Sequence, residues 1–116
     1  MDDKLSRILE IILEFRDERD WGQFHDPKNL AEAISIESGE LLEKFLWMTT
    51  DESKRLDSAK LDRIKEEISD IVIFALYLCY DLNIDLLKAI ENKIEMNRKK
   101  YPVEKSRGSS RKYTEI

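Results

Sequence analysis

Four acidic residues occur as two pairs with the same spacing: Glu37 and Glu40, then Glu67 and Asp70. Residues i and i+3 lie on one face of an α-helix, with Cβ atoms about 5–6 Å apart. Two such helices packed antiparallel would direct four carboxylates toward one point, where they repel one another unless a cation or protons neutralise them. Hard oxygen ligands suit Mg²⁺, which takes its remaining ligands from water and phosphate oxygens. The spacing therefore predicts a Mg²⁺ site for a nucleotide polyphosphate.

Acidic residues are common in this chain, so the spacing alone does not establish a site. The sequence holds 25 Asp and Glu among 116 residues, and most such pairs form solvated faces of helices. Asp70, however, directly precedes the apolar residues 71–74, where an unpaired carboxylate would be costly. Gly39 stands inside the helix that carries Glu37 and Glu40, at a cost of about 1 kcal/mol relative to Ala. We therefore expect Asp70 to enter a buried segment and another group to approach the backbone closely at Gly39.

A di-iron carboxylate centre is another use of inward-facing glutamates. Such a centre requires two Glu-x-x-His pairs on its helices. The chain has one histidine, His25, which lies in an expected loop. The di-iron alternative is therefore excluded.

The elements that must position the acidic pairs are all helices. Apolar residues recur at three- and four-residue steps, and no strand alternation is present. Asp26 and Asp85 are suited to cap helix starts, Asn83 to end a helix, and Pro102 to stop the last one. The sequence predicts an all-α fold, an antiparallel four-helix bundle with helices over residues 5–15, 27–45, 61–80 and 86–100.

The segment 71–80 is apolar on nearly every side of its helix. A helix of this kind must be covered all round, which four short helices of one chain cannot easily do. We therefore expect the core to be completed by oligomerisation, as a homo-oligomer.

Composition narrows the class and the partners of the protein. The length fits one domain, and we expect a catalytic body over residues 1–102 and a basic tail over residues 103–116, extended or disordered on its own. Residues 1–97 are acidic, which disfavours binding to nucleic acid, whereas residues 98–116 hold seven Lys or Arg and two Glu. The longest apolar run is half the length of a membrane span, and a single cysteine, Cys79, fits a reducing cytosol. We expect a cytoplasmic protein with no membrane partner.

The motifs together identify a family. The E-x-x-E and E-x-x-D pairs match position by position the hallmark of the all-α nucleoside triphosphate pyrophosphohydrolases, the MazG-like group. The chain further resembles the dCTP pyrophosphatase branch of that group, over most of its length from about residue 15 to residue 115. The segments that carry this resemblance are residues 18–21 (E-R-D-W), 23–25 (Q-F-H), 39–47, 97–102 (N-R-K-K-Y-P) and 109–115 (S-S-R-K-Y-T-E).

The resemblance implies hydrolysis between the α- and β-phosphates of a nucleoside triphosphate. It also implies a cellular role in removing unwanted nucleotides from the pool. Mg²⁺ would be held by Glu37, Glu40, Glu67 and Asp70, with Glu37 or Glu40 taking the proton of the attacking water. The implied substrate-binding residues fall into three groups. Trp21, His25, Trp47 and Phe74 would contact the base and sugar, Lys93 and Asn97 would face phosphate or sugar, and Arg111 and Lys112 lie in a tail that would fold over the triphosphate of its own or a neighbouring subunit. The family also implies a dimer or tetramer.

Several alternatives stay open at this point. The vertebrate members of the branch have a histidine where this chain has Ile12 and a tyrosine where it has Phe74, so the preferred base is not fixed. dCTP, dUTP, a modified pyrimidine triphosphate, a purine nucleotide or a broad mixture are all candidates. The tail could instead be a solvated terminus or an arm for nucleic acid. A non-catalytic helical module, for oligomerisation or nucleotide-dependent regulation, is the rival from another class.

Overall fold

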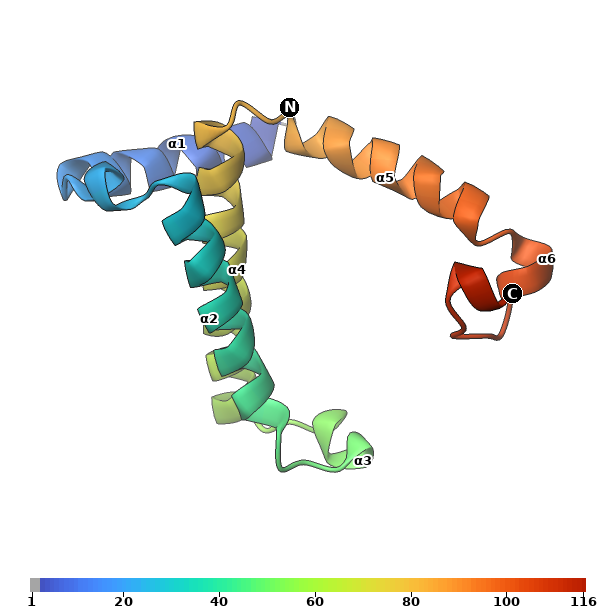
Figure 1. Cartoon of the computed structure of the whole chain (residues 1–116). Coiled ribbons are helices and arrows are strands. Elements are labelled where there is room, and N and C mark those ends of the chain that lie inside the picture. Colours follow the sequence, from blue (N-terminus) through green and yellow to red (C-terminus); the bar gives the residue numbers. More distant parts are fainter. Residues whose placement is uncertain (1–2) are drawn as a thin grey trace. The chain divides into compact units, whose positions relative to one another are not determined.

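The computed structural model describes residues 3–116, and within that range it contains helices and loops but no strand (Figure 1). The all-α prediction is confirmed. The four long helices are α1 (Asp3–Glu18), α2 (Pro27–Phe45), α4 (Ser58–Asp81) and α5 (Leu86–Lys100). The shorter elements are η1 (Trp21–Phe24), α3 (Thr50–Ser53), α6 (Val103–Ser106) and η2 (Tyr113–Glu115).

Aspartates set the starts of three long helices. The side chain of Asp26 accepts a hydrogen bond from the Asn29 amide at 2.8 Å, and Asp85 accepts one from Lys88 at 3.2 Å. Both caps were expected from the sequence; Asp57, which caps α4 in the same way, was not. Each cap satisfies a backbone N–H that the helix cannot pair internally, which stabilises it by about 1 kcal/mol.

The end of α4 is set by Asn83, as expected. This residue takes a left-handed backbone conformation (φ 56°), which asparagine tolerates better than most residues. The contacts of the chain divide at the next residues into two compact units, 1–84 and 85–116. Each unit is described by itself below.

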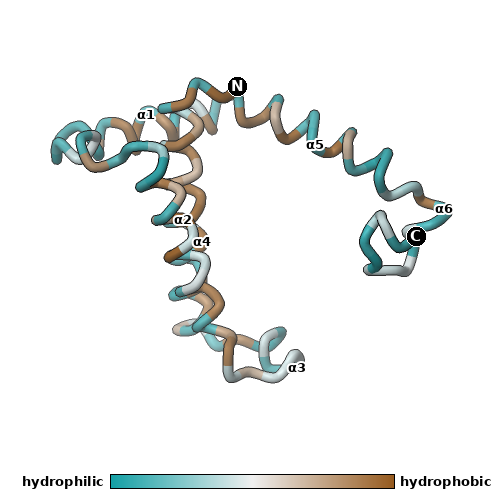
Figure 2. Tube along the Cα trace, in the orientation of Figure 1, coloured by the Kyte–Doolittle hydropathy of each residue, from teal (hydrophilic) through white to brown (hydrophobic). Residues whose placement is uncertain are grey.

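In the first unit, α2 and α4 run antiparallel and pack along each other, and α1 contacts both α4 and η1 (Figure 1). Hydrophobic residues recur along α1, α2 and α4 (Figure 2). The most deeply buried of them is Leu30 on α2, 1% exposed, and the other core residues are Ile12, Ile64, Leu76 and Tyr77. The antiparallel pairing brings the acidic segment of α2 against that of α4.

Much apolar surface of the first unit is left uncovered within the described chain. On α4, Ile68, Val72 and Tyr80 are each about half exposed, and Ile8, Ile11 and Phe15 on α1 are similar. Apolar surface of this extent on a small unit is typical of an interface. The expected homo-oligomer is consistent with it and stays a prediction.

In the second unit, part of the tail is ordered, so the expectation of an extended or disordered segment is wrong for it. The carbonyl of Pro102 accepts hydrogen bonds from the amides of Lys105 and Ser106, which closes the single turn of α6. The rings of Tyr101 and Tyr113 meet edge to face at 6.0 Å, which ties the tail back to the end of α5. Pattern reasoning missed this contact because it joins residues outside any helical repeat.

Among the described helices of both units, none is at once long and apolar enough to cross a membrane.

Candidate metal centre and adjoining pocket

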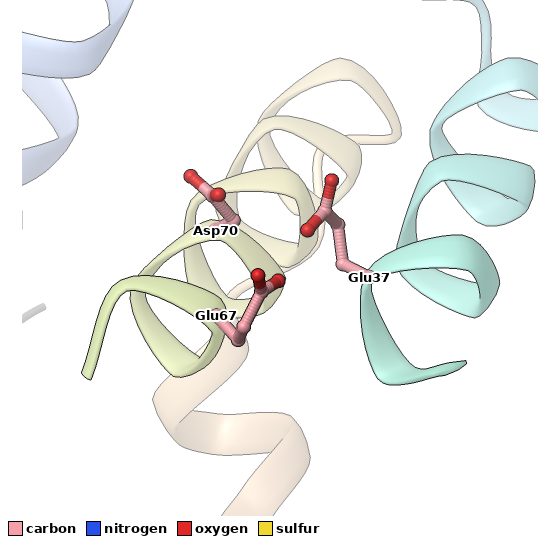
Figure 3. Close-up of side chains that lie close together, drawn as sticks. All are labelled: Glu37, Glu67 and Asp70. Carbon is pink, nitrogen blue, oxygen red and sulfur yellow. The ribbon is translucent and has the colours of Figure 1, made fainter. Parts of the chain in front are cut away.

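Three of the four predicted acidic residues meet. Glu37 on α2 and Glu67 and Asp70 on α4 each place a carboxylate oxygen within 4.8 Å of the other two. Figure 3 shows Glu37 reaching across from α2 toward the pair on α4. The i,i+3 spacing puts Glu67 and Asp70 on one face of α4, and the antiparallel packing supplies Glu37. The result is a cluster of oxygen ligands, called here the carboxylate cluster.

The negative charge of the carboxylate cluster is not balanced by the described residues around it. The pKa of Glu37 is raised to about 7, mainly by burial. Hydrogen bonds from the protonated form to Glu67 and Glu40 contribute, and so do the negative charges of Glu40 and Asp70. Oε2 of Glu37 and Oε2 of Glu67 are buried, and no hydrogen-bond donor reaches either oxygen in the described residues. Buried carboxylate oxygens without a donor are costly. A cation bound among them would remove that cost.

One lysine reaches the edge of the carboxylate cluster. Nζ of Lys44 on α2 lies 3.9 Å from Oε1 of Glu67, at the outer limit of an ion pair. The Glu67 oxygen without a donor is the other one, Oε2. Lys44 therefore neutralises the cluster only in part.

One expectation about the acidic segments is wrong, and a second is not met by the described part of this chain. Asp70 is exposed rather than buried, because consecutive helical residues point about 100° apart and the apolar residues after it face other directions. A Cβ placed on Gly39 would meet no atom within 4 Å, so no described part of the chain approaches the backbone there. Glu40 is half-buried and is not one of the three clustered ligands, although it lies near enough to raise the pKa of Glu37.

A cavity of about 360 Å³ adjoins the carboxylate cluster. Its walls come from α1, η1, α4 and the residue after η1, and they are mainly apolar. They include Ile12, Phe15, Trp21, His25, Ile73, Phe74 and Tyr77. Asp70 belongs both to this lining and to the carboxylate cluster, so a ligand in the cavity has a carboxylate at its edge. Three predicted substrate-binding residues, Trp21, His25 and Phe74, lie around this cavity.

His25 is a polar group among these apolar walls. Its ring packs 5.2 Å from that of Tyr77 and 6.2 Å from that of Phe74. Burial and the positive charge of Arg16 lower the pKa of His25, while Asp81 partly offsets them. The imidazole is therefore neutral at neutral pH, and its buried Nδ1 has no partner among the described residues. It can hydrogen-bond a ligand in the cavity.

The remaining predicted binding residues are not brought to this cavity. Trp47 follows α2, is 91% exposed and is not part of the lining. Lys93, Asn97, Arg111 and Lys112 all belong to the second unit. Roles for these five residues stay predictions.

Sequence reasoning missed a buried group behind the cavity. The guanidinium of Arg16 on α1 makes two hydrogen bonds of 3.0 Å to the Asp81 carboxylate on α4, and it lies 4.7 Å from the centre of the Tyr77 ring. Arg16 is 6% exposed and follows Ile12 by one helical turn on the buried face of α1. Its position on an apolar face could have predicted a buried ion pair, since a buried arginine needs an acidic partner.

Comparison with known proteins is consistent with these features. A sequence model described as the MazG-like family matches residues 33–116. dCTP pyrophosphatase 1 of Homo sapiens is 41% identical over 114 residues, which cover 97% of this chain and 67% of the human protein. The Bos taurus protein of the same name is also 41% identical, over 97% of this chain and 68% of its own length. A crystal structure of a pyrophosphatase from Archaeoglobus fulgidus superimposes with a TM-score of 0.82 at 41% identity, covering 88% of this chain and 95% of that one.

Proposed function

Since this chain belongs to the MazG-like family, in the branch of the dCTP pyrophosphatases, we propose that it hydrolyses pyrimidine deoxynucleoside triphosphates, dCTP or a close relative, to the monophosphate and pyrophosphate with Mg²⁺. The observation that carries this proposal is the position of Asp70, which belongs both to the carboxylate cluster and to the lining of the 360 Å³ cavity. A nucleotide with its base in that cavity would have its phosphates beside the carboxylates. The cellular role is removal of unwanted nucleotides from the pool.

The carboxylate cluster suits Mg²⁺ in its chemistry. All three ligand groups are carboxylates, and the donor-free oxygens of Glu37 and Glu67 are what a hard cation would occupy. When bound, Mg²⁺ supplies positive charge to phosphate oxygens and lowers the pKa of water. Glu40, outside the three clustered ligands but close to Glu37, is free to accept the proton of the attacking water. Glu37 is the alternative acceptor.

The base, the sugar and the remaining phosphate oxygens of the nucleotide are assigned to side chains by their chemistry. Trp21 and Phe74 offer aromatic surface to a base, and stacking of this kind is worth about 1–3 kcal/mol per base. His25 offers its unpartnered Nδ1 to the base or sugar. In the second unit, Lys93 and Asn97 face phosphate or sugar. The tail with Arg111 and Lys112 folds over the triphosphate of its own or a neighbouring subunit. Trp47, which is 91% exposed, contributes to the base and sugar pocket, and a dimer or tetramer covers the exposed apolar residues of α1 and α4.

The proposed reaction is tested by product analysis. dCTP, dUTP, dTTP, dATP, dGTP and CTP are incubated with the protein in Mg²⁺ and, separately, in EDTA. We expect monophosphate and pyrophosphate, formed only with Mg²⁺ and fastest from a pyrimidine deoxynucleotide. Diphosphate and orthophosphate would show cleavage of the wrong bond. No turnover, together with no effect of Mg²⁺ and nucleotide on the melting temperature, would leave a non-catalytic helical module.

Stabilisation of the protein by Mg²⁺ is expected to depend on pH through Glu37. With a pKa of about 7, Glu37 is mostly protonated at pH 6 and must lose its proton to bind metal, so Mg²⁺ should raise the melting temperature more at pH 8 than at pH 6. In metal-free protein the sign is opposite. The folded state binds more protons than the unfolded state between pH 4.5 and about 7, so stability falls as pH rises through that window.

Melting curves at both pH values, with and without Mg²⁺, measure this effect. Glu37→Gln is the control, since it removes the titrating group and should give the same small response at either pH. An equal Mg²⁺ response of the wild type at pH 6 and pH 8 would contradict the assignment of Glu37 as a ligand.

Lys44 is expected to compete with the metal. Its ammonium group, 3.9 Å from Glu67, opposes a second cation at the same carboxylate, so Lys44→Met should tighten Mg²⁺ binding about threefold in the absence of nucleotide. Titration calorimetry measures the affinity. Lys28→Met is the matched control, because Lys28 pairs with Glu32 on an exposed face of the same helix and should leave the affinity unchanged. Weaker binding in Lys44→Met would mean that Lys44 instead orients Glu67.

A further inference from the structure

We propose that Tyr77 sets the depth of the cavity and so determines the size of the base that the enzyme accepts. This inference rests on the proposed function, since it assigns a role at the same site. Tyr77 lies outside the carboxylate cluster. Its side chain lines the cavity, and only 4% of the residue is exposed.

The position of Tyr77 on α4 places it at the end of the cavity away from the metal ligands. Tyr77 follows Asp70 by seven residues, which is two helical turns along the same face and about 10 Å along the axis. Phe74 lies between the two and lines the same cavity. A nucleotide with its phosphates at Asp70 would direct its base along this face toward Tyr77.

The ring of Tyr77 is held from three sides. Its hydroxyl donates a hydrogen bond of 2.5 Å to the carbonyl of Ile12, and the guanidinium of Arg16 lies over the ring at 4.7 Å. Arg16 is itself fixed by its two hydrogen bonds to Asp81. The His25 ring packs on Tyr77 at 5.2 Å, tilted by 41°. These contacts prevent the ring from rotating aside, so a larger ligand cannot displace it cheaply.

The contacts also decide how Tyr77 discriminates. Because its hydroxyl proton is donated to Ile12, the side chain has no free hydrogen-bond donor, and it presents chiefly the apolar surface of its ring to the cavity. Discrimination by such a surface depends on size and shape, and it is worth roughly 10- to 200-fold in kcat/KM. Tyr77 therefore acts on the fit of the base and leaves the reacting phosphates untouched.

The test compares a purine and a pyrimidine substrate in variants of Tyr77. In Tyr77→Leu, the cavity deepens, and the ratio of kcat/KM for dATP to that for dCTP should rise about tenfold, mainly through KM. Tyr77→Phe keeps the ring and should keep the wild-type ratio. Asp62→Leu is the control on the same helix, since the Asp62 side chain is 71% exposed and outside the lining. Tyr77→Met gives the same comparison, should Tyr77→Leu fail to fold.

An unchanged ratio, with both substrates slowed equally, would overturn the inference and leave Tyr77 a structural residue. An inactive wild type would contradict the proposed function instead. In that case, the increase in melting temperature caused by dAMP and by dCMP is compared in the same variants. A relative gain for dAMP in Tyr77→Leu supports the inference, and equal changes for both ligands overturn it.

Discussion

Replacement of Glu37 by glutamine is expected to lower kcat about a thousandfold while making the metal-free protein more stable at pH 8. The loss follows because Glu37 is the one ligand that α2 contributes to the carboxylate cluster, and charge stabilisation at a metal site is worth several kcal/mol, with a factor of ten for each 1.36 kcal/mol. The gain follows because the substitution removes a buried negative charge whose ionisation is unfavourable, as its pKa of about 7 indicates. Steady-state kinetics and melting curves on the same preparation measure both effects.

The two effects together separate a ligand role from a structural role. Glu43→Gln provides the control, since Glu43 is an exposed carboxylate of the same helix and its replacement should change neither quantity. A Glu37→Gln variant that is both inactive and less stable would indicate that Glu37 supports the fold. A variant with normal kcat would remove Glu37 from the metal site.

Replacement of Arg16 by alanine should lower the free energy of unfolding by about 3 kcal/mol, the low end of the range for a broken buried ion pair. The side chain of Arg16 is 8% exposed and that of Asp81 is 22% exposed, so the substitution leaves a poorly solvated carboxylate without a partner. Denaturant unfolding measures the change. Lys28→Ala breaks an exposed pair with Glu32, where the side chains are 82% and 56% exposed, and should lower the stability far less than Arg16→Ala does.

A double variant distinguishes charge from packing in this prediction. Arg16→Met combined with Asp81→Leu removes both charges and fills similar volume, so it should recover most of the stability lost in Arg16→Ala. A cost below about 1 kcal/mol for Arg16→Ala would show that the pair contributes little. Equal losses in the single and double variants would assign the cost to packing against Tyr77.

The helices and part of the carboxylate cluster could be predicted from the sequence because their signals are local. Asp26, Asp85 and Asn83 act on backbone groups a few residues away, and each was assigned correctly. The pairing of Glu67 with Asp70 likewise follows from helical geometry alone. Neither the caps nor the i,i+3 pairing depends on how the helices pack against one another.

Features that depend on packing between distant segments could not be predicted. Arg16 and Asp81 are 65 residues apart in sequence, as are Ile12 and Tyr77, and no periodicity relates such positions. The i,i+3 spacing does not determine how each helix is rotated about its own axis. That rotation decides why Asp70 is exposed and why Glu40 is not one of the three clustered ligands. The ordered tail depends on the contact of Tyr113 with Tyr101.

The central claim, that Glu37, Glu67 and Asp70 together hold a divalent cation, is tested most directly by anomalous X-ray diffraction. Crystals grown with Mn²⁺ in place of Mg²⁺ reveal the ion by its own scattering, independently of any assay. We predict an anomalous peak bonded at about 2 Å to oxygens of all three carboxylates. Fully occupied Mn²⁺ elsewhere in the crystal, with no peak among these oxygens, would contradict the account.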